Sequence, residues 1–227
     1  MREKPSLLRH GLDDSSRRVP VKRRGPAATV IAVAGVILAS GESRRFGEAN
    51  KLLAGVGGEA IVRRTVRAFV EAGLHPVAVV VGFQATAIAS ALEGLELTLV
   101  RNPDFREGQS ASLRRGIAAV READGAVIGV ADQPLLSAQV IRDLVREWNR
   151  SRSTIVIPRY GGTRGNPVLF SRELFGELAT VRGDVGGRAV IAAHPREVRW
   201  LDVDDPRIGA DVDSLESYWR LREDFGG

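Results

Sequence analysis

Short apolar runs alternate with helix-like segments along most of this chain, and this alternation constrains the fold more than any other feature. The runs are rich in β-branched residues and do not alternate with polar ones, which is typical of strands covered on both faces of a parallel sheet. The expected strands are 30–39, 76–81, 95–100, 126–130, 154–158, 168–170 and 198–201. The expected helices are 60–72, 85–92, 110–123, 138–150, 171–178, 187–194 and 214–223. This order predicts βαβ units and an α/β fold with a mostly parallel sheet.

The length of 227 residues suits one folded domain with a substantial core and would leave a second domain cramped. We expect a basic, disordered tail at 1–28 and the folded domain at 29–227. Residues 1–26 hold eight Lys or Arg and three acidic residues, whereas the rest of the chain holds 25 of each sign. Because the net positive charge is confined to the tail, a general surface for nucleic acid is not supported.

Several kinds of site are excluded or made unlikely by residue type. The chain has no cysteine, which excludes disulfides, thiolate zinc sites and a cysteine nucleophile. His10, His75 and His194 are too scattered to form a metal-ligand motif. Any metal is therefore expected to be a hard cation held by carboxylates, such as Mg²⁺. No apolar run reaches the roughly 18 residues that a membrane span needs, so we expect no membrane association.

The amino-terminal segment also permits another interpretation. Residues 16–22 resemble a twin-arginine export signal, and the apolar run at 29–39 has the length of a signal-peptide core. Cleavage after that run would remove the first predicted strand, so a disordered tail or an upstream start-codon assignment is the simpler explanation.

The stretch 36–53, VILASGESRRFGEANKLL, predicts a functional loop. An apolar strand ends in a turn with glycine, serine and two arginines, and a lysine follows, a pattern that suits polyphosphate binding. It is not a P-loop, because no Ser or Thr follows Lys51, and it is not a dinucleotide fingerprint, because Gly41 does not begin G-x-G-x-x-G. An ordinary strand-to-helix loop with solvated arginines is the alternative.

Carboxylates follow two other predicted elements. Asp132 comes just after the strand at 126–130, and Asp211 and Asp213 lie two apart before the last helix. Because ligands of parallel sheets collect beyond the carboxyl ends of strands, these side chains are candidates for Mg²⁺. A turn aspartate and simple helix capping are the alternatives, since Ser137 and Ser214 are expected N-caps nearby.

These segments together are similar to those of the molybdenum cofactor cytidylyltransferases and the wider MobA-like NTP transferase family, also called molybdopterin nucleotidyltransferase-like. The resemblance spans residues 34–221. It includes L-A-x-G-x-S-x-R-x-G followed by K-L-L, NPDFREGQSASLRRGI at 102–117, DQP at 132–134, GGTRGNPVLFSRELF at 161–175, GDVGGRAVI at 183–191 and DVDSLESY at 211–218. The chain departs from the family pattern at Phe46, where methionine is usual, and at Ala54-Gly55, where proline is common.

The resemblance implies a single-domain, Rossmann-like three-layer αβα sandwich, as in nucleotide-diphospho-sugar transferases. It implies a cytoplasmic, Mg²⁺-dependent enzyme that moves NMP from an NTP to a phosphate monoester, with release of pyrophosphate. The acceptor would be molybdopterin carrying molybdenum, and CTP is favoured over GTP. Such chemistry needs alignment and charge stabilisation more than a protein nucleophile.

The resemblance also implies roles for individual residues. The catalytic residues would be Arg45, Lys51 and Asp132, with Asp132 and Asp213 as metal ligands. The nucleotide would be bound by Leu38, Ala39, Ser40, Gly41, Ser43, Arg45, Lys51, Gly108, Ser110 and Ser112. The acceptor would be bound by Arg164, Asn166, Gly183, Asp184 and Arg188. A plain turn at R-G-N-P and a flexible loop at G-D-V-G-G-R are the alternatives for the acceptor side.

Other functions stay open at this level. The chain could be a non-catalytic carrier that binds nucleotide or molybdopterin and passes it to a molybdoenzyme or its chaperone. It could also be a transferase of the same family with another phosphorylated acceptor. An exported or nucleic-acid-associated protein that uses the basic tail is a third reading.

Overall fold

A computed structural model describes residues 32–46 and 49–224 of the chain. The predicted basic tail at 1–28, the candidate export signal and the first residues of the expected strand at 30–39 lie outside the described residues.

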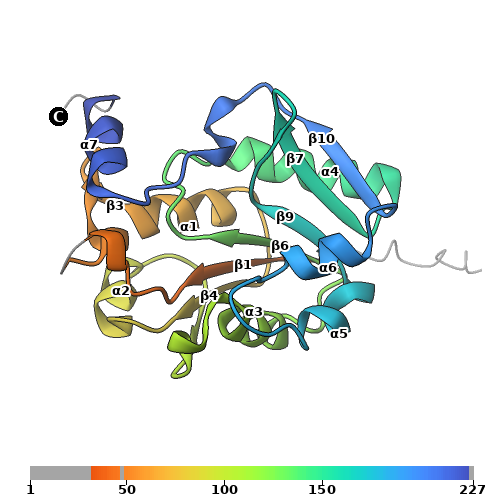
Figure 1. Ribbon diagram of the computed structural model, residues 1–227, viewed down its shortest axis with the longest axis horizontal. Coiled ribbons are helices and arrows are strands. Elements are labelled where there is room, and N and C mark those ends of the chain that lie inside the picture. Colours follow the sequence, from red (N-terminus) through yellow and green to blue (C-terminus); the bar gives the residue numbers. More distant parts are fainter. Residues whose placement is uncertain (1–31, 47–48, 225–227) are drawn as a thin grey trace, which may run out of the picture. The chain divides into compact units, whose positions relative to one another are not determined.

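A central sheet of eight strands organises the described chain (Figure 1). Its order is β10-β7-β9-β6-β1-β4-β5, and β8 pairs with β7. The strands are β1 (Val33–Ala39), β4 (Val77–Val81), β5 (Thr98–Arg101), β6 (Gly125–Val130), β7 (Ile155–Tyr160), β8 (Thr163–Arg164), β9 (Val168–Ser171) and β10 (Val198–Asp202). Pairing is parallel except at β9, which is antiparallel to β6 and β7, and at β8. The predicted mostly parallel sheet is confirmed.

Helices cover both faces of the sheet and give two cores. One core joins the sheet to α1 (Ile61–Glu71), α2 (Ala85–Ala91) and α4 (Ala138–Ser151). The other joins it to α3 (Gln109–Ala119), α5 (Phe175–Leu178) and α6 (Arg188–Ala193). Ile37 of β1 belongs to the first core and the adjacent Val36 to the second, because successive side chains of a strand point to opposite faces. This explains the continuous apolar run of β1 and confirms the three-layer architecture.

The chain reverses its direction of travel across the sheet at β1. From β1 it passes through α1 to β4 and through α2 to β5, and α3 then returns it to β6 on the other side of β1. Sheets of this kind bind ligands where the strand order reverses, beyond the carboxyl ends. The pairing of Leu38 with Val130 places Ser40 and Asp132 each two residues beyond that register, at one edge of the sheet.

Some short elements were not predicted. A hairpin of β2 (Gly55–Val56) and β3 (Glu59–Ala60) turns at Gly57 and Gly58, which both have positive φ. The expected helix at 171–178 is a 3-10 turn, η4 (Arg172–Leu174), followed by α5.

Both expected N-caps are confirmed. The Ser137 hydroxyl accepts from Val140 N–H at 3.4 Å at the start of α4. The Ser214 hydroxyl accepts from Ser217 N–H at 3.2 Å at the start of the last helix, α7 (Leu215–Asp224). Within the described residues, no helix is long and apolar enough to cross a membrane.

Candidate active site

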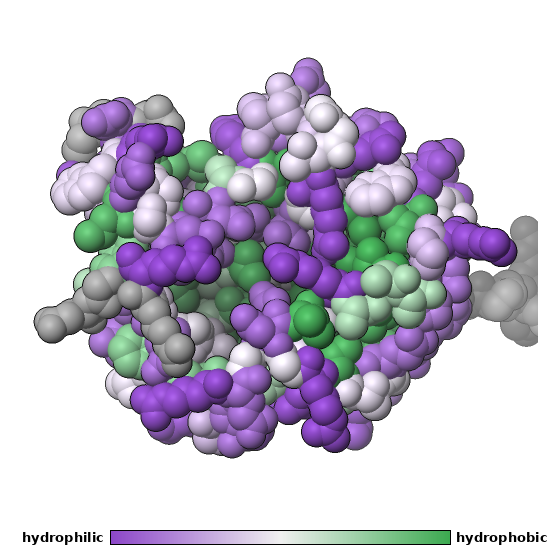
Figure 2. Space-filling model, in the orientation of Figure 1, coloured by the Kyte–Doolittle hydropathy of each residue, from purple (hydrophilic) through white to green (hydrophobic). Residues whose placement is uncertain are grey.

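A cavity of about 820 Å³ lies at the carboxyl ends of β1 and β6. Its walls come from the loop after β1, the turn before α3, the end of β6, the loop before α6 and the segment before α7. In the space-filling view the face is hollowed near its centre and hydrophilic residues surround the hollow (Figure 2). The position agrees with the edge at which doubly wound sheets bind ligands.

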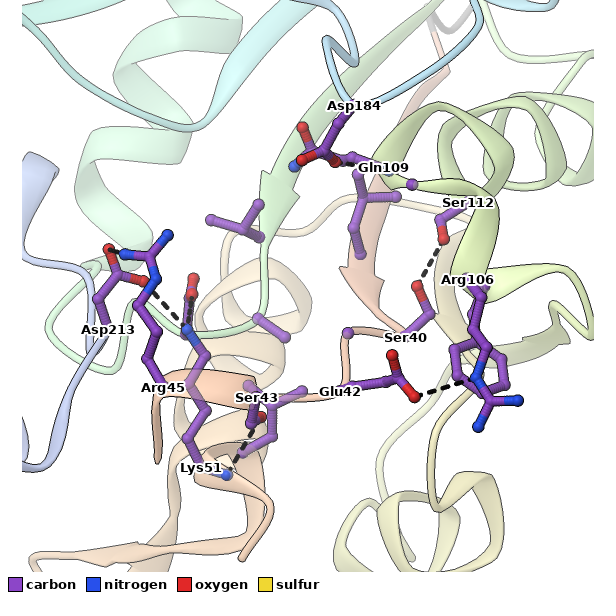
Figure 3. Close-up of a pocket in the computed structure, with 18 of the residues that line it drawn as sticks. Ser40, Glu42, Ser43, Arg45, Lys51, Arg106, Gln109, Ser112, Asp184 and Asp213 are labelled. Atoms are coloured by element: carbon purple, nitrogen blue, oxygen red, sulfur yellow. Dashed lines mark hydrogen bonds and ion pairs between the residues drawn. The ribbon is translucent and has the colours of Figure 1, made fainter. Parts of the chain in front are cut away.

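Lys51, Asp132 and Asp213 form the charged end of the cavity, and we call them the lysine–carboxylate cluster. The Lys51 ammonium contacts Asp132 Oδ2 at 2.6 Å and Asp213 Oδ1 at 3.2 Å (Figure 3). The side chains of Lys51 and Asp132 are only 15% and 17% exposed, whereas Asp213 is 58% exposed. Arg45 approaches Asp213 Oδ2 at 4.0 Å and is largely solvent-exposed. Residues distant in sequence thus converge on one lysine.

The loop after β1 is tied back on itself by Ser43. Ser43 has a positive φ of 55°, and its hydroxyl accepts from the backbone N–H of Lys51 at 3.3 Å. The same hydroxyl donates to Asn50 Oδ1 at 3.3 Å, and Asn50 Oδ1 also accepts from Leu52 N–H at 3.0 Å. Asn50 therefore caps the 3-10 turn η2 (Lys51–Leu53). These hydrogen bonds fix the position of the Lys51 backbone, from which its side chain extends into the cavity.

The donor set of the cluster fits a magnesium-type ion that arrives with a phosphate ligand. Asp132 Oδ1 is buried and has no hydrogen-bond partner among the described residues, although Oδ2 is bonded to Lys51. A desolvated, unpartnered carboxylate oxygen is costly unless a ligand satisfies it. The described residues contain no group of three or more His, Cys, Asp or Glu that could hold a metal alone. Mg²⁺ commonly takes one or two carboxylates and completes its shell with water and substrate phosphates.

Asp211 and Asp213, which the sequence could not separate, have different surroundings. Asp213 lines the cavity, whereas Asp211 accepts a 2.6 Å hydrogen bond from Gln133 outside the set of cavity-lining residues. Desolvation and the charge of Asp132 raise the pKa of Asp211 to about 6, with a smaller contribution from Asp213. Val212 between them donates its N–H to the Asp132 carbonyl at 2.9 Å, which fixes this segment beside the end of β6.

The opposite wall of the cavity is built by the loop after β1 and the start of α3. The Ser40 and Ser112 hydroxyls are 2.5 Å apart, and both side chains are buried. Asn102 Nδ2 donates to Ser112 at 2.9 Å. Gly108, with φ of 98°, precedes α3, and a Cβ there would lie 2.9 Å from the Gly183 carbonyl oxygen. Asp184 accepts from Gln109 N–H at 3.0 Å and so joins the loop before α6 to this wall.

The structure brings most of the predicted site residues to this cavity. Those that line it are Leu38, Ser40, Gly41, Ser43, Arg45, Lys51, Gly108, Ser112, Asp132, Asp184, Arg188 and Asp213.

Five predicted site residues do not line the cavity. Ala39 is buried in the core. Ser110 is buried too, and its hydroxyl accepts from Gly186 N–H at 3.3 Å while its own N–H donates to the Gly183 carbonyl at 3.1 Å. These bonds anchor the loop before α6 against α3. Asn166 donates its N–H to the Ile208 carbonyl at 3.2 Å.

The fourth is Gly183, whose carbonyl accepts from Ser110 N–H. The fifth, Arg164, lies on β8 and does not line the cavity. Desolvation and the positive charge of Arg188 lower the pKa of Arg164. Two guanidinium groups are therefore close enough to repel, which is the kind of arrangement that an anionic ligand stabilises.

Five polar or aromatic residues of the cavity were not singled out from the sequence. They are Glu42, Phe105, Arg106, Glu107 and Gln109. Phe105, Arg106 and Glu107 lie between β5 and α3, and Gln109 is the first residue of α3. Their position just past the end of a strand was the available signal. The family pattern in this segment marks glycine and serine and does not include their charged neighbours.

Comparisons with known proteins show what the chain is similar to. The MobA-like NTP transferase domain matches residues 35–198. A nicotine blue oxidoreductase of Paenarthrobacter nicotinovorans is 30% identical over 196 residues, which cover 83% of this chain and 96% of that protein. A "probable molybdenum cofactor guanylyltransferase" of Mycobacterium avium is 28% identical over 149 residues, 65% of this chain and 73% of the relative.

Among solved structures, the Rv0371c protein of Mycobacterium tuberculosis is similar with a TM-score of 0.74 and 31% identity, over 86% of this chain and 99% of that one. The complex of Rv0371c with manganese is similar with a TM-score of 0.70 and 30% identity, over 85% and 98% of the two chains. The predicted fold class, that of the nucleotide-diphospho-sugar transferases, is confirmed. The domain match, the strand order and the relatives agree, and the chain belongs to the MobA-like NTP transferase family.

Proposed function

We propose that the protein is a divalent-metal-dependent nucleotidyltransferase that moves NMP from an NTP to a phosphate monoester. The acceptor is molybdopterin carrying molybdenum and the nucleotide is CTP, with GTP as the alternative because the M. avium relative is named a guanylyltransferase. The observation that carries the proposal is the lysine–carboxylate cluster at the ligand-binding edge of the sheet, with one Asp132 oxygen buried and unpartnered.

The charge balance of the cavity supports the requirement for a metal. The basic residues that line it are Arg45, Lys51, Arg106 and Arg188, and the acidic ones are Glu42, Glu107, Asp132, Asp184 and Asp213. Four positive charges against five negative ones leave no surplus to offset a triphosphate. A divalent ion held by Asp132 and Asp213 would supply that charge and polarise phosphate oxygens. The manganese complex of Rv0371c is consistent with a divalent ion in this family.

The side chains of the cluster would then bind and align the triphosphate. The Lys51 ammonium is shared by two carboxylates and can donate to a phosphate oxygen once they bind metal. Arg45 is exposed and lies at the edge of the cluster, so its guanidinium can reach a second phosphate oxygen with little cost in packing. An acceptor phosphate oxygen forms a bond to the α-phosphorus, and the bond to the bridging oxygen breaks, so that its electron pair leaves with pyrophosphate. No protein nucleophile takes part.

The acceptor is proposed to approach from the side of Arg164 and Arg188. Their mutual repulsion, which contributes to the lowered pKa of Arg164, would be relieved by an anionic group. Asn166, Gly183 and Asp184 belong to the same proposed acceptor side. A molybdoenzyme or its chaperone in the cytoplasm would receive the product.

Two other functions are kept as alternatives. A carrier of nucleotide or molybdopterin would bind its ligand without turnover, and the unpartnered Asp132 oxygen favours a metal-dependent reaction over it. A redox function, as in the name of the Paenarthrobacter relative, would require a redox cofactor. The loop after β1 does not contain the dinucleotide fingerprint, so this loop gives no support to a redox function with a dinucleotide cofactor.

The test is pyrophosphate release from CTP, GTP, ATP and UTP with Mg²⁺, with and without molybdopterin or its molybdenum-loaded form. Acceptor-dependent release from CTP is expected. Release from GTP alone would keep the transferase and change the nucleotide. Release from no nucleotide, with folded protein and active acceptor, would contradict the proposal.

A further inference from the structure

A second ion pair lies in the cavity and takes no part in the proposed phosphate chemistry. Arg106, in the 3-10 turn η3 (Phe105–Glu107), donates from Nε to Glu42 Oε1 at 3.1 Å. Both side chains line the cavity. Figure 3 shows this pair on the opposite side from the lysine–carboxylate cluster, beside Ser40 and Ser112.

The two partners differ in how firmly they are held. The Glu42 side chain is 20% exposed, whereas Arg106 is 73% exposed. The Arg106 guanidinium lies 5.3 Å from the centre of the Phe105 ring. Phe105 packs closely against Gly82, where an added Cβ would lie 2.6 Å from the Phe105 Cβ. Glu42 is therefore a mostly buried acceptor, whereas the exposed Arg106 side chain can change its conformation without disturbing the core.

This pair lies at the side of the cavity opposite the lysine–carboxylate cluster (Figure 3). A nucleoside triphosphate whose phosphates were held at the cluster would extend its base toward this wall. The Ser112 hydroxyl on that wall is already bonded to Ser40 and to Asn102. Glu42 and Arg106 offer charged hydrogen-bonding groups at the same wall.

We propose that Glu42, positioned by Arg106, selects the nucleobase by accepting a hydrogen bond from an exocyclic amino group. This inference rests on the proposed function, because it assumes that a nucleotide binds in this cavity. A carboxylate accepts readily from the amino group of cytosine, and guanine also presents an amino group. Uracil presents carbonyl oxygens at its exocyclic positions, and a carboxylate repels them. The pair would thus favour amino-bearing bases over uracil.

The Glu42→Gln substitution separates this role from a purely structural one. A glutamine has the same shape and its amide can either accept or donate, so uracil should become acceptable. The expected change is a gain in relative UTP binding, which misfolding cannot produce. Arg106→Met, at an exposed position, should reduce the same preference for CTP over UTP, because Glu42 loses the contact with Arg106.

The experiment is calorimetric titration of the full-length protein with CTP, UTP and tripolyphosphate in the presence of Mg²⁺. The wild type should bind CTP at least about tenfold more tightly than UTP, and Glu42→Gln should reduce that ratio about tenfold. Tripolyphosphate, which has no base, should bind both proteins equally. The matched control is Glu122→Gln, since Arg121 and Glu122 make the same 3.1 Å contact away from the cavity.

The outcomes distinguish this inference from the proposed function. An unchanged CTP-to-UTP ratio in both variants would overturn the inference alone, as would a wild type that binds the two nucleotides equally. A wild type that binds neither nucleotide nor tripolyphosphate would overturn the proposed function as well.

Discussion

Many charged side chains line two cavities of this molecule. Of these two, only the cavity at the ends of β1 and β6 contains a buried carboxylate oxygen that has no hydrogen-bond partner among the described residues. The second cavity, the α4–β10 groove, measures about 680 Å³ and lies between α4, the end of β10 and the 3-10 turn η5 (Pro206–Gly209). Five acidic and three basic side chains line it: Asp143, Glu147, Asp202, Asp204, Asp205, Arg146, Arg150 and Arg207. The number of charged side chains alone would not show which of the two, the groove or the cavity at the ends of β1 and β6, is the functional site.

The difference lies in how the carboxylates are paired. In the groove, Arg159 holds Asp202 and Arg207 holds Asp205, and these hydrogen bonds lower the pKa of each aspartate. In the cavity, Asp132 keeps a buried oxygen without a partner among the described residues. Beside it, desolvation and the Asp132 charge raise the pKa of Asp211 to about 6. Carboxylates whose ionised form is stabilised by arginine suit a structural role. Carboxylates whose ionised form is destabilised suit a site that binds a cation.

Removing the Asp132 carboxylate, whose Oδ1 has no hydrogen-bond partner among the described residues, should have the largest effect. Asp132→Asn should lower the rate of pyrophosphate release by about a hundredfold or more, because electrostatic stabilisation of phosphate transfer is lost. The control is Asp205→Asn, because the Asp205 side chain is 15% exposed and that of Asp132 is 17% exposed. Circular dichroism should show both variants folded. Near wild-type turnover in Asp132→Asn would show that this carboxylate is not needed for the reaction.

Removing the lysine of the cluster should have the next largest effect. Lys51→Met removes the donor to phosphate and leaves Asp132 unpaired, so KM for the nucleotide should rise about tenfold or more. The unfolding free energy should fall by about 1–3 kcal/mol, because a mostly buried carboxylate loses its partner. Steady-state kinetics and urea titration measure the two effects. Arg207→Met in the groove is the control, and an equal rise in KM there would show that the effect is not specific to the cluster.

The raised pKa of Asp211 predicts a smaller, pH-dependent effect. The folded-state pKa of about 6 lies above the ordinary value of 3.8, so the folded protein holds this proton more strongly than the unfolded chain. Stability from this group therefore falls as the pH rises from about 4 to about 6 and stays constant above that. Asp211→Asn should gain up to about 1 kcal/mol relative to wild type over this range, since solvent screens the carboxylate. Urea titrations at pH 4, 5, 6 and 7 would test it, and a difference that shrinks with pH would contradict the assignment.

Changing the groove should have the smallest effect on activity. Asp205→Asn removes an ion pair with Arg207 in which the contact distance is 2.8 Å. Pyrophosphate release should stay within about twofold of wild type, because neither Asp205 nor Arg207 lines the cavity and distant, independent sites act separately. A large loss of turnover would mean that the groove takes part in function.

The sequence predicted the elements of the fold because their signals are local. Runs such as 77–81 are apolar throughout, and amphipathic segments follow them, so strand and helix were separable. The antiparallel insertion of β9 was not predicted, because strand direction depends on partners far along the chain. The hairpin at Gly57 and Gly58 had a visible two-glycine signal, but its strands are too short for a periodic pattern.

The site was partly predictable for a geometric reason. Lys51 and Asp132 both follow strands that end at the same edge, so their convergence could be expected from a parallel sheet. The direction in which a side chain points could not be predicted from the sequence. Ser110 illustrates this, because its hydroxyl accepts a hydrogen bond from Gly186 and does not line the cavity. The sequence also does not show which residues of different loops contact one another. The contact of Glu42 with Arg106 joins two loops whose relative position only the folded chain defines.

The central claim is that Asp132 binds a divalent ion together with a nucleotide. Electron paramagnetic resonance of Mn²⁺, titrated with wild type and Asp132→Asn in the presence and absence of CTP, tests it most directly. We expect CTP to strengthen Mn²⁺ binding to the wild type at least about tenfold and Asp132→Asn to lose this gain. Equal Mn²⁺ binding by both proteins in the presence of CTP would contradict it.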